Sequence, residues 1–253
     1  MENEASRVEG RPNLPEPARE QPQKICLEFY EVDDSSSDDF KKAMQIYAVS
    51  FPEAERRPEA AIERALRNGK IRMIACGIDG IVRMMALLCP INGTPFLLVE
   101  YIATSQEFRG QGIGSLFLKK VFELLDSPKF DYLLVEVEDP GEDPSESLDK
   151  TKARRIDFYR RLGMKELKDM RYLLPPMQGD KPTEMRLMVL SRYDAGIPDE
   201  DSLGEDMPDR DILDGSVIKN VITMIFHELY GRSQGDEILT SILEGIPDRI
   251  SLV

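Results

Sequence analysis

One stretch of the sequence decides the fold, and it reads Val99-Glu100-Tyr101-Ile102-Ala103-Thr104-Ser105-Gln106-Glu107-Phe108-Arg109-Gly110-Gln111-Gly112-Ile113-Gly114. It begins as a strand, passes through a loop rich in glycine, and continues into an amphipathic helix of about Gly112–Leu125. A helix N-terminus leaves several N–H groups unpaired and carries positive partial charge, so it binds anions. Glycines let the backbone approach a pyrophosphate where a Cβ atom would collide, and Arg109 adds a cation. The stretch therefore predicts an anion site between a strand and a helix.

The spacing of this loop separates it from two simpler interpretations. A lone Gly-x-Gly would indicate only a tight strand–helix turn, and Arg-x-x-Gly-x-Gly is much more specific. A dinucleotide-binding fingerprint is excluded, because its three-glycine spacing is absent and the loop follows a meander of strands instead of an opening βαβ unit.

Periodicity and turn residues predict the elements around this stretch. Serines 35–37 offer N-caps for a helix whose apolar face is Phe40, Ala43, Met44 and Tyr47. Asp79-Gly80 is a favoured two-residue hairpin turn. The predicted strands are Ile25–Glu31, Ile71–Ile78, Ile81–Leu88, Phe96–Thr104, Tyr132–Glu138, Glu166–Leu174 and Glu184–Ser191, and the other predicted helices are Arg57–Asn68 and Lys152–Leu162.

Composition along the chain predicts its domain organisation. Residues 1–24 are rich in Pro, Glu and Arg and are expected to be a disordered leader. Residues 25–193 are expected to form the main domain, with 139–149 as a solvated acidic insertion. Residues 194–253 are expected to be an acidic linker followed by a pair of helices that packs back onto the main domain.

Charge and rare residues exclude several function classes. The 33 Lys and Arg against 47 Asp and Glu give a net charge of −14, which disfavours a nucleic-acid partner. No apolar stretch approaches the roughly 20 residues that span a bilayer, so no membrane partner is expected. Cys26, Cys76 and Cys89 lack CxxC spacing, and without a signal peptide they predict reduced thiols in a cytoplasmic protein. A single histidine, His227, argues against a His-rich metal site, and no metal is expected.

Two motifs give the chain its resemblance to a known family. The loop satisfies Gln/Arg-x-x-Gly-x-Gly/Ala through Arg109, Gly112 and Gly114, and a later helix satisfies Phe-Tyr-x-x-x-Gly-Phe through Phe158, Tyr159 and Gly163, with Met164 in place of the last Phe. At these residues the chain resembles the GNAT superfamily of acetyl-CoA-dependent N-acetyltransferases, from about Cys26 to Ser191. The resemblance implies an α/β (α+β) fold with a mixed, splayed central sheet flanked by helices. The C-terminal helical extension lies outside the family pattern.

The resemblance also implies which residues bind acetyl-CoA, the acyl-donor cosubstrate. It places the pantetheine arm and thioester against Ile102, Ala103 and Thr104, and the pyrophosphate against Arg109, Gly110, Gln111, Gly112, Ile113 and Gly114. Tyr159 would be the general acid that protonates the departing thiolate; the alternative is a core aromatic beside Phe158. The family's Asn on the following loop has no equivalent that we can place, and Lys152 to Arg155 are alternatives for phosphate contacts.

The general base is less well defined by the sequence. Glu136 and Glu138 share one face of their strand because side chains alternate, and Glu136 matches the position of a glutamate in some family members. Glu100, on the neighbouring strand, is the second candidate. Alternatively, these glutamates line a solvated or cation-binding groove. With Asp139, Glu142 and Asp143 they could attract a cationic acceptor.

These observations predict an N-acetyltransferase that transfers an acetyl group to a primary amine by direct attack in a ternary complex. The acceptor would be a small molecule, a polyamine, a peptide N-terminus or a protein lysine, and the acidity of the chain weakly favours a cationic one. The alternatives are a non-catalytic acyl-CoA-binding sensor or interaction module with the same fold, and a scaffold whose extension docks a partner. The sequence does not determine the oligomeric state.

Overall fold

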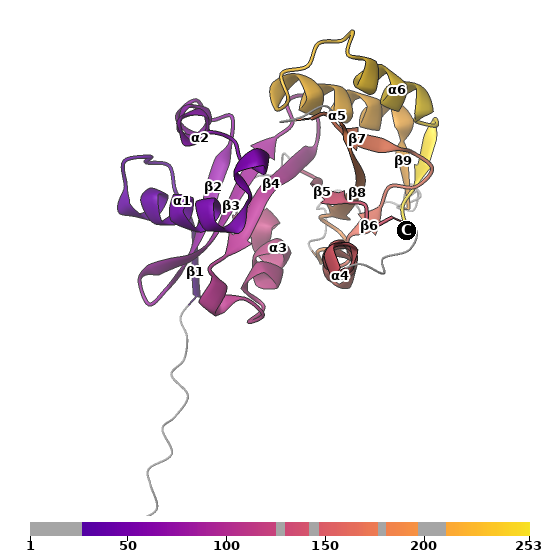
Figure 1. Ribbon diagram of the computed structural model, residues 1–253. Helices are drawn as coiled ribbons and strands as arrows, with labels where there is room; N and C mark the ends of the chain where they lie inside the picture. The colour runs from indigo at the N-terminus through magenta and orange to yellow at the C-terminus, as the bar shows by residue number, and fades with distance from the viewer. Residues whose placement is uncertain (1–26, 125–129, 142–146, 177–180, 197–210) are drawn as a thin grey trace, which may run out of the picture.

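The computed structural model describes residues 27–124, 130–141, 147–176, 181–196 and 211–253. Strands β1–β4 and the helices beside them form one half of the molecule, and β5–β8 with the C-terminal extension form the other (Figure 1). The elements are β1 (Leu27–Glu31), α1 (Asp38–Ser50), α2 (Glu59–Arg67), β2 (Arg72–Ile78), β3 (Ile81–Pro90), β4 (Phe96–Thr104), α3 (Ile113–Leu124), β5 (Tyr132–Glu138), α4 (Ser147–Arg161), β6 (Lys165–Glu166), β7 (Tyr172–Leu174), β8 (Thr183–Ser191), β9 (Ile212–Asp214), α5 (Gly215–Glu228), α6 (Glu237–Gly245) and β10 (Arg249–Ser251).

The central sheet is mixed and mostly antiparallel. Its described strands follow the order β1-β2-β3-β4-β5-β8-β6, and β7 pairs with β8. The β2–β3 turn has Asp79 at φ 51° and Gly80 at φ 73°, the left-handed conformation that a two-residue hairpin with a right-handed twist requires. This confirms the predicted Asp79-Gly80 turn and the predicted sheet class.

The centre of the sheet is where β4 and β5 part. These two strands are the parallel pair, and their ladder covers only Phe96–Leu98 against Tyr132–Leu134. Beyond Leu98 the edge of β4 that faces β5 therefore forms no ladder with it. On its other edge β4 carries a bulge: Val99 pairs with Leu88 and Tyr101 with Leu87, so that Glu100 has no partner on β3. A bulge of this kind redirects a side chain.

Two hydrophobic clusters cover the two faces of the sheet. On one face α1, α2, α5 and α6 pack against the sheet, with Phe40, Tyr47, Phe96 and Phe226 among the buried side chains. On the other face α3 and α4 pack against it. The serine cap of α1 forms as predicted, since Ser37 Oγ accepts a hydrogen bond from the Phe40 amide at 3.1 Å, and Phe40, Ala43, Met44 and Tyr47 are buried.

The C-terminal extension belongs to the first of these clusters. Ile218, Val221, Ile222 and Ile225 of α5 are buried in it, whereas Val217 is 36% exposed. Strands β9 and β10 pair with each other, and the end of the chain continues the main sheet: Glu166 N donates to Val253 O and Lys168 N to Ser251 O. Neither strand was predicted from the sequence.

Two other predictions need correction. The strand predicted over Glu166–Leu174 is two short strands, because Asp169 has φ 62° and interrupts the extended backbone. Helix α4 begins at Ser147, so the end of the predicted insertion is helical. The leader, the middle of that insertion (142–146) and most of the linker (197–210) lie outside the described residues. Over the described ranges, the chain has no helix both long and apolar enough for a membrane span.

Candidate active site

The glycine loop, defined here as Gln106–Gly112, connects β4 to α3. Gly110 has φ 76° and Gly112 has φ 81°, a backbone conformation that residues with a Cβ atom adopt only at a cost. A Cβ atom built at either glycine would meet nothing within 4 Å, so the space beside both is open. The first intrahelical bond of α3 runs from Leu116 N to Gly112 O at 2.9 Å. The amides just before Leu116 are therefore those that a helix N-terminus offers to an anion.

Arg109 is exposed, and its side-chain hydrogen bonds stabilise this loop. Its Nε donates to Thr104 O at 3.1 Å, and one terminal nitrogen donates to Ser50 Oγ at 3.2 Å. The guanidinium thus connects the end of β4 to the end of α1. Of the other predicted coenzyme residues, Ile102 packs towards α3 and Ala103 towards α1, and Gly114 approaches Phe158 of α4 at 4.0 Å from its built Cβ atom.

Glu100 lies at the bulge of β4 and is held by an arginine. One terminal nitrogen of Arg57 donates to both carboxylate oxygens, at 3.1 and 2.9 Å, and the Glu100 side chain is 11% exposed. The Arg57 amide in turn donates to Tyr47 Oη at 2.8 Å, which fixes the loop before α2 over β4. Burial raises the pKa of Glu100 to about 7; Arg57 opposes the shift and the charge of Glu136 adds to it. A carboxylate with such a pKa suits a general base near neutral pH.

Glu136, on β5, has a different environment. One carboxylate oxygen accepts the hydroxyl of Tyr172, from β7, and the other accepts the hydroxyl of Tyr230 at 2.7 Å, from the chain just after α5. Burial raises the pKa of Glu136, and both tyrosine hydrogen bonds oppose the shift. Glu100 and Glu136 are each two residues beyond the last paired positions of β4 and β5. We call these two glutamates with Arg57, Tyr172 and Tyr230 the carboxylate cluster.

Tyr159 lies on the opposite face of the sheet. It packs with the α3 and α4 cluster, and its ring meets Phe158 edge-on at 5.2 Å. Burial raises the pKa of Tyr159 to about 12, with Arg155 opposing the shift. The hydroxyl is therefore protonated at physiological pH and can donate a proton.

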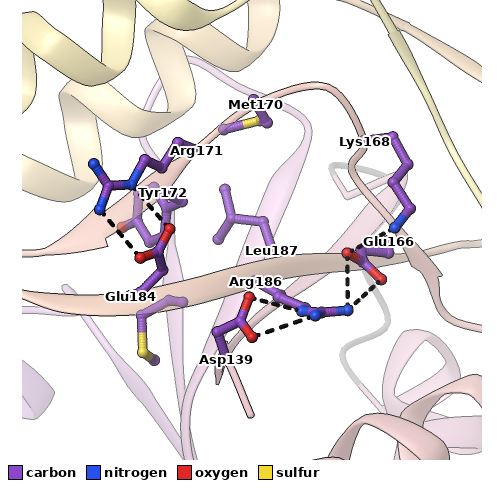
Figure 2. A pocket seen from close by; sticks show the side chains of 10 residues that line it. Asp139, Glu166, Lys168, Met170, Arg171, Tyr172, Glu184, Arg186 and Leu187 are labelled. Atoms are coloured by element: carbon purple, nitrogen blue, oxygen red, sulfur yellow. Dashed lines mark hydrogen bonds and ion pairs between the residues drawn. The ribbon is translucent and has the colours of Figure 1, made fainter. Parts of the chain in front are cut away.

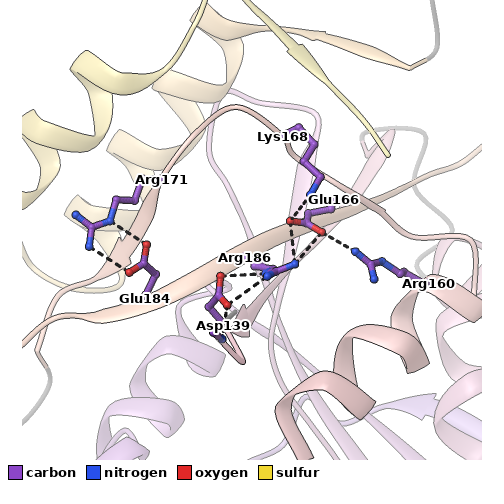
Figure 3. A network of polar contacts seen from close by, with 8 residues as sticks. Asp139, Arg160, Glu166, Lys168, Arg171, Glu184 and Arg186 are labelled. Atoms are coloured by element: carbon purple, nitrogen blue, oxygen red, sulfur yellow. Dashed lines mark hydrogen bonds and ion pairs between the residues drawn. The ribbon is translucent and has the colours of Figure 1, made fainter. Parts of the chain in front are cut away.

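Charged contacts hold the end of α4, and with it Tyr159, against the sheet (Figure 3). Glu166 of β6 is 6% exposed, and its carboxylate meets Arg160 at 2.9 Å, Lys168 at 3.2 Å and Arg186 at 3.4 Å. Three cations around one buried carboxylate satisfy its charge. Because Arg160 directly follows Tyr159, this contact fixes the last turn of the helix that carries it.

A hollow of about 220 Å³ lies beside this network, between β7, β8 and the loop after β6 (Figure 2). Its charged walls are compensated internally, since Arg186 pairs with Asp139 at 3.0 Å and Arg171 with Glu184 at 2.9 Å. A second hollow, of about 410 Å³, lies at the β3–β4 turn. Neither hollow is lined by Glu100, Glu136 or the glycine loop. The candidate active site therefore lies elsewhere, where β4 and β5 part.

The carboxylates predicted to attract a cationic acceptor differ in their pairing. Glu138 meets Arg155 at 3.4 Å and Asp139 meets Arg186 at 3.0 Å, whereas Glu142 and Asp143 lie outside the described residues. Glu136 is held by two tyrosines and by none of the described Lys or Arg side chains. Of the described carboxylates beside this strand, Glu138 and Asp139 are thus paired with arginines, whereas Glu136 is not.

The structure brings the sequence candidates together and adds three residues. Glu100 and Glu136 flank the parting on one face of the sheet, and Tyr159 lies on the other face. Sequence reasoning missed Arg57, Tyr172 and Tyr230, since none belongs to a motif and each is more than 35 residues from the glutamate that it holds. His227 lies in α5 with a buried Nε2 atom that has no described partner.

Comparison with known proteins identifies the family. The family profile described as Acetyltransferase (GNAT) family matches residues 40–164. This chain carries a GNAT acetyltransferase domain. The match runs from within α1 to the residue before β6 and so includes the glycine loop, Glu100, Glu136 and Tyr159, while Tyr172 and Tyr230 lie beyond it.

Solved structures share the fold of this GNAT domain. A protein from Bacteroides thetaiotaomicron assigned to the GNAT family superposes with a TM-score of 0.57 at 24% identity, over 81% of this chain and 99% of that one. An N-acetyltransferase from Staphylococcus aureus Mu50 gives 0.50 at 12% identity, over 66% and 99%. A GNAT acetyltransferase from Elizabethkingia anophelis, solved with acetyl-CoA bound, gives 0.44 at 13% identity, over 65% and 97%. No curated protein sequence matches this chain significantly.

Two features of the GNAT domain fit acetyl-CoA. The open space beside Gly110 and Gly112 admits a diphosphate close to the backbone, and the β4 edge over Ile102–Thr104 is free of a β5 ladder, which leaves main-chain groups for an amide-bearing arm. As for metals, the described residues contain no group of three or more His, Cys, Asp or Glu side chains that could hold one.

Proposed function

We propose that this protein is an acetyl-CoA-dependent N-acetyltransferase that acetylates a primary amine by direct attack in a ternary complex. The observation that carries the proposal is the arrangement about the parting of β4 and β5. A carboxylate with a pKa of about 7, Glu100, lies on one face, and a protonated hydroxyl, Tyr159, lies on the other. A thioester held between the strands would therefore have a base on its acceptor side and an acid on its leaving-group side.

In this proposal acetyl-CoA lies along β4. The amides at the start of α3 would bind its diphosphate, with Arg109 alongside, and the β4 edge at Ile102–Thr104 would bind the pantetheine arm. Holding both reactants in line supplies much of the rate enhancement of such a reaction, because it replaces a bimolecular encounter by an intramolecular one. Bound acetyl-CoA supplies the activated acetyl group.

Each proton then has a defined destination. Glu100 accepts a proton from the acceptor ammonium, directly or through water, and frees the nitrogen lone pair. The nitrogen–carbon bond forms as the carbon–sulfur bond breaks, and Tyr159 donates its proton to the departing sulfur. The second proton, which the nitrogen loses on becoming an amide, passes through solvent and restores the Tyr159 hydroxyl, and Glu100 releases its proton to solvent. Glu100 suits the role of base because burial raises its pKa to about 7, whereas the hydrogen bonds from two tyrosine hydroxyls lower the pKa of Glu136 against the effect of burial.

The test is release of free thiol from acetyl-CoA by the full chain, with a panel of small amines, polyamines and lysine-containing peptides, and mass spectrometry of the product. We expect thiol release that depends on amine and matches the acetylated amine in amount. The control is the reaction without amine, which measures hydrolysis. If calorimetry detects acetyl-CoA binding while no amine supports thiol release, the chain is instead a non-catalytic acyl-CoA-binding module.

A further inference from the structure

Tyr230 reaches Glu136 from the C-terminal extension, outside the matched GNAT residues. Its place is fixed by aromatic packing: its ring meets Phe226 edge-on at 5.8 Å, and Phe226 meets Tyr172 edge-on at 6.3 Å. The turn after α5 is closed by Gly231 at φ 62° and by a bond of 2.9 Å from Arg232 N to Phe226 O. Arg232 also donates to Pro176 O at 3.1 Å. The hydroxyl of Tyr230 is thus held in place by a rigid segment.

The negative charges of the two glutamates at the parting have different surroundings. The charge of Glu100 is balanced by Arg57 at 2.9 Å. Glu136 accepts two neutral hydroxyls, and the described residues offer it no ion pair. A partly buried carboxylate is costly unless a cation balances it. Two donors fix the orientation of Glu136 without neutralising it, which leaves an oriented negative charge beside the proposed acceptor position.

We propose that Tyr230 and Tyr172 position Glu136 to bind a second cationic group on the acceptor, so that the C-terminal extension sets the specificity of the enzyme for diamine-like or lysine-like amines. The inference rests on the proposed function, in which Glu100 is the base. Since the attacking nitrogen must lose its charge before it reacts, the cation held by Glu136 is a different group of the same acceptor. Tyr230 is a positioning residue, because it acts through Glu136.

Four titratable groups face Glu136. Tyr172 and Tyr230 donate to it and lower its pKa against the effect of burial. Glu100 and the buried thiol of Cys89 feel its charge, which raises the pKa of each. Removing the Tyr230 hydroxyl therefore raises the pKa of Glu136 further and shifts its ionisation to higher pH. A lost packing contact alone would not produce that change.

The experiment compares two acceptors, 1,4-diaminobutane and n-pentylamine, which share the attacking amine and differ in the second ammonium. For the wild type we expect kcat/KM about tenfold or more higher with the diamine. For Tyr230→Phe we expect KM for the diamine to rise roughly tenfold, the cost of one hydrogen bond to a charged group. We expect little change in kcat and in the KM values for n-pentylamine and acetyl-CoA. As the pH is lowered, the variant should lose diamine binding at a higher pH than the wild type does.

The matched control is Tyr30→Phe. Tyr30 lies on β1, at the far edge of the sheet, and its hydroxyl donates to Asp39 at 3.0 Å. It should leave the diamine preference unchanged. Tyr172→Phe should act as Tyr230→Phe does. Equal KM values for the diamine in wild type and Tyr230→Phe, with unchanged pH dependence, would overturn the inference even if the wild type acetylates amines.

Calorimetry separates this inference from the proposed function. With 1,4-diaminobutane as the probe, we expect wild-type binding that Tyr230→Phe weakens and Glu136→Gln weakens roughly tenfold or more, whether or not acetyl transfer is detected. Failure of the wild type to bind the diamine, or equal binding by the Glu136→Gln variant, would overturn the inference. Failure of every amine to release thiol would overturn the proposed function alone.

Discussion

The glycine loop follows β4, and the carboxylate cluster spans the parting of β4 and β5. The two sites are built differently. The loop is a short continuous segment whose conformation depends on Gly110 and Gly112 at positive φ. The cluster joins Arg57, Glu100, Glu136, Tyr172 and Tyr230 from five separate segments. Local backbone chemistry determines the first site, and long-range packing determines the second.

This difference teaches where chain-specific properties arise. A diphosphate is recognised by main-chain amides, which any sequence with the right glycines can supply. In the proposed mechanism the acceptor is recognised by side chains, and two residues of the carboxylate cluster, Tyr172 and Tyr230, come from beyond the matched GNAT residues. Changes in the loop should therefore affect coenzyme binding alone, whereas changes in the cluster should affect acceptor binding and, at Glu100, the chemical step as well.

The largest effect should follow from Glu100→Gln. Loss of the proposed base should lower kcat/KM by about 10²–10⁴-fold. Because the base acts when ionised and burial raises the pKa of Glu100 to about 7, wild-type kcat/KM should increase with pH through about 7. The variant should lose this increase of kcat/KM with pH. The readout is a pH profile of thiol release, with acetyl-CoA affinity as the control; an unchanged profile would rule out Glu100 as the base.

Gly215→Ala should destabilise the extension. A Cβ atom there would lie 1.9 Å from Pro247 O, and such overpacking costs about 3 kcal/mol at the upper end of its usual range. For a chain of this size that corresponds to a fall in Tm of roughly 6–12 °C. Gly245→Ala is the matched control, since a Cβ atom there meets nothing within 4 Å. Equal thermal unfolding of the two variants would contradict the packing of α5 on the β10 segment.

Tyr159→Phe should lower kcat about 100-fold, since general-acid catalysis typically contributes at least that much. The affinity for acetyl-CoA should stay within about twofold, because the hydroxyl acts on the departing sulfur and the ring remains. Steady-state kinetics and calorimetry measure the two quantities. Unchanged turnover, under conditions where the chemical step limits the rate, would leave Tyr159 with a packing role only.

The smallest effect in this series should be that of Gly112→Asp on acetyl-CoA binding. The substitution places a side chain at φ 81° and a negative charge beside the proposed diphosphate, so Kd should rise about tenfold, or about 1.4 kcal/mol. Gly93→Asp is the matched control, with φ 71° and open space around its Cβ position. If both variants bind acetyl-CoA equally, the glycine loop is not the coenzyme site.

Much of the fold could be predicted because local signals agree with tertiary packing. The Ser37 cap, the Asp79-Gly80 turn, the apolar run of β4 and the helix after Gly112 all depend on neighbours in the sequence. The predictions failed where the local sequence signal for secondary structure is weak. Asp169 interrupts a run that alternates like a strand, and β9 and β10 are three residues each, too short to recognise without their partners.

The sequence by itself determined the family, the sheet class and the candidates Glu100, Glu136 and Tyr159, because motif spacing and side-chain periodicity act over a few residues. Only the tertiary structure distinguished the two glutamates, by giving one of them an arginine and the other two tyrosines. The physical reason is that the protonation and orientation of a carboxylate depend on its burial and partners. Those partners come from the loop before α2, from β7 and from the segment after α5, and packing alone brings them together.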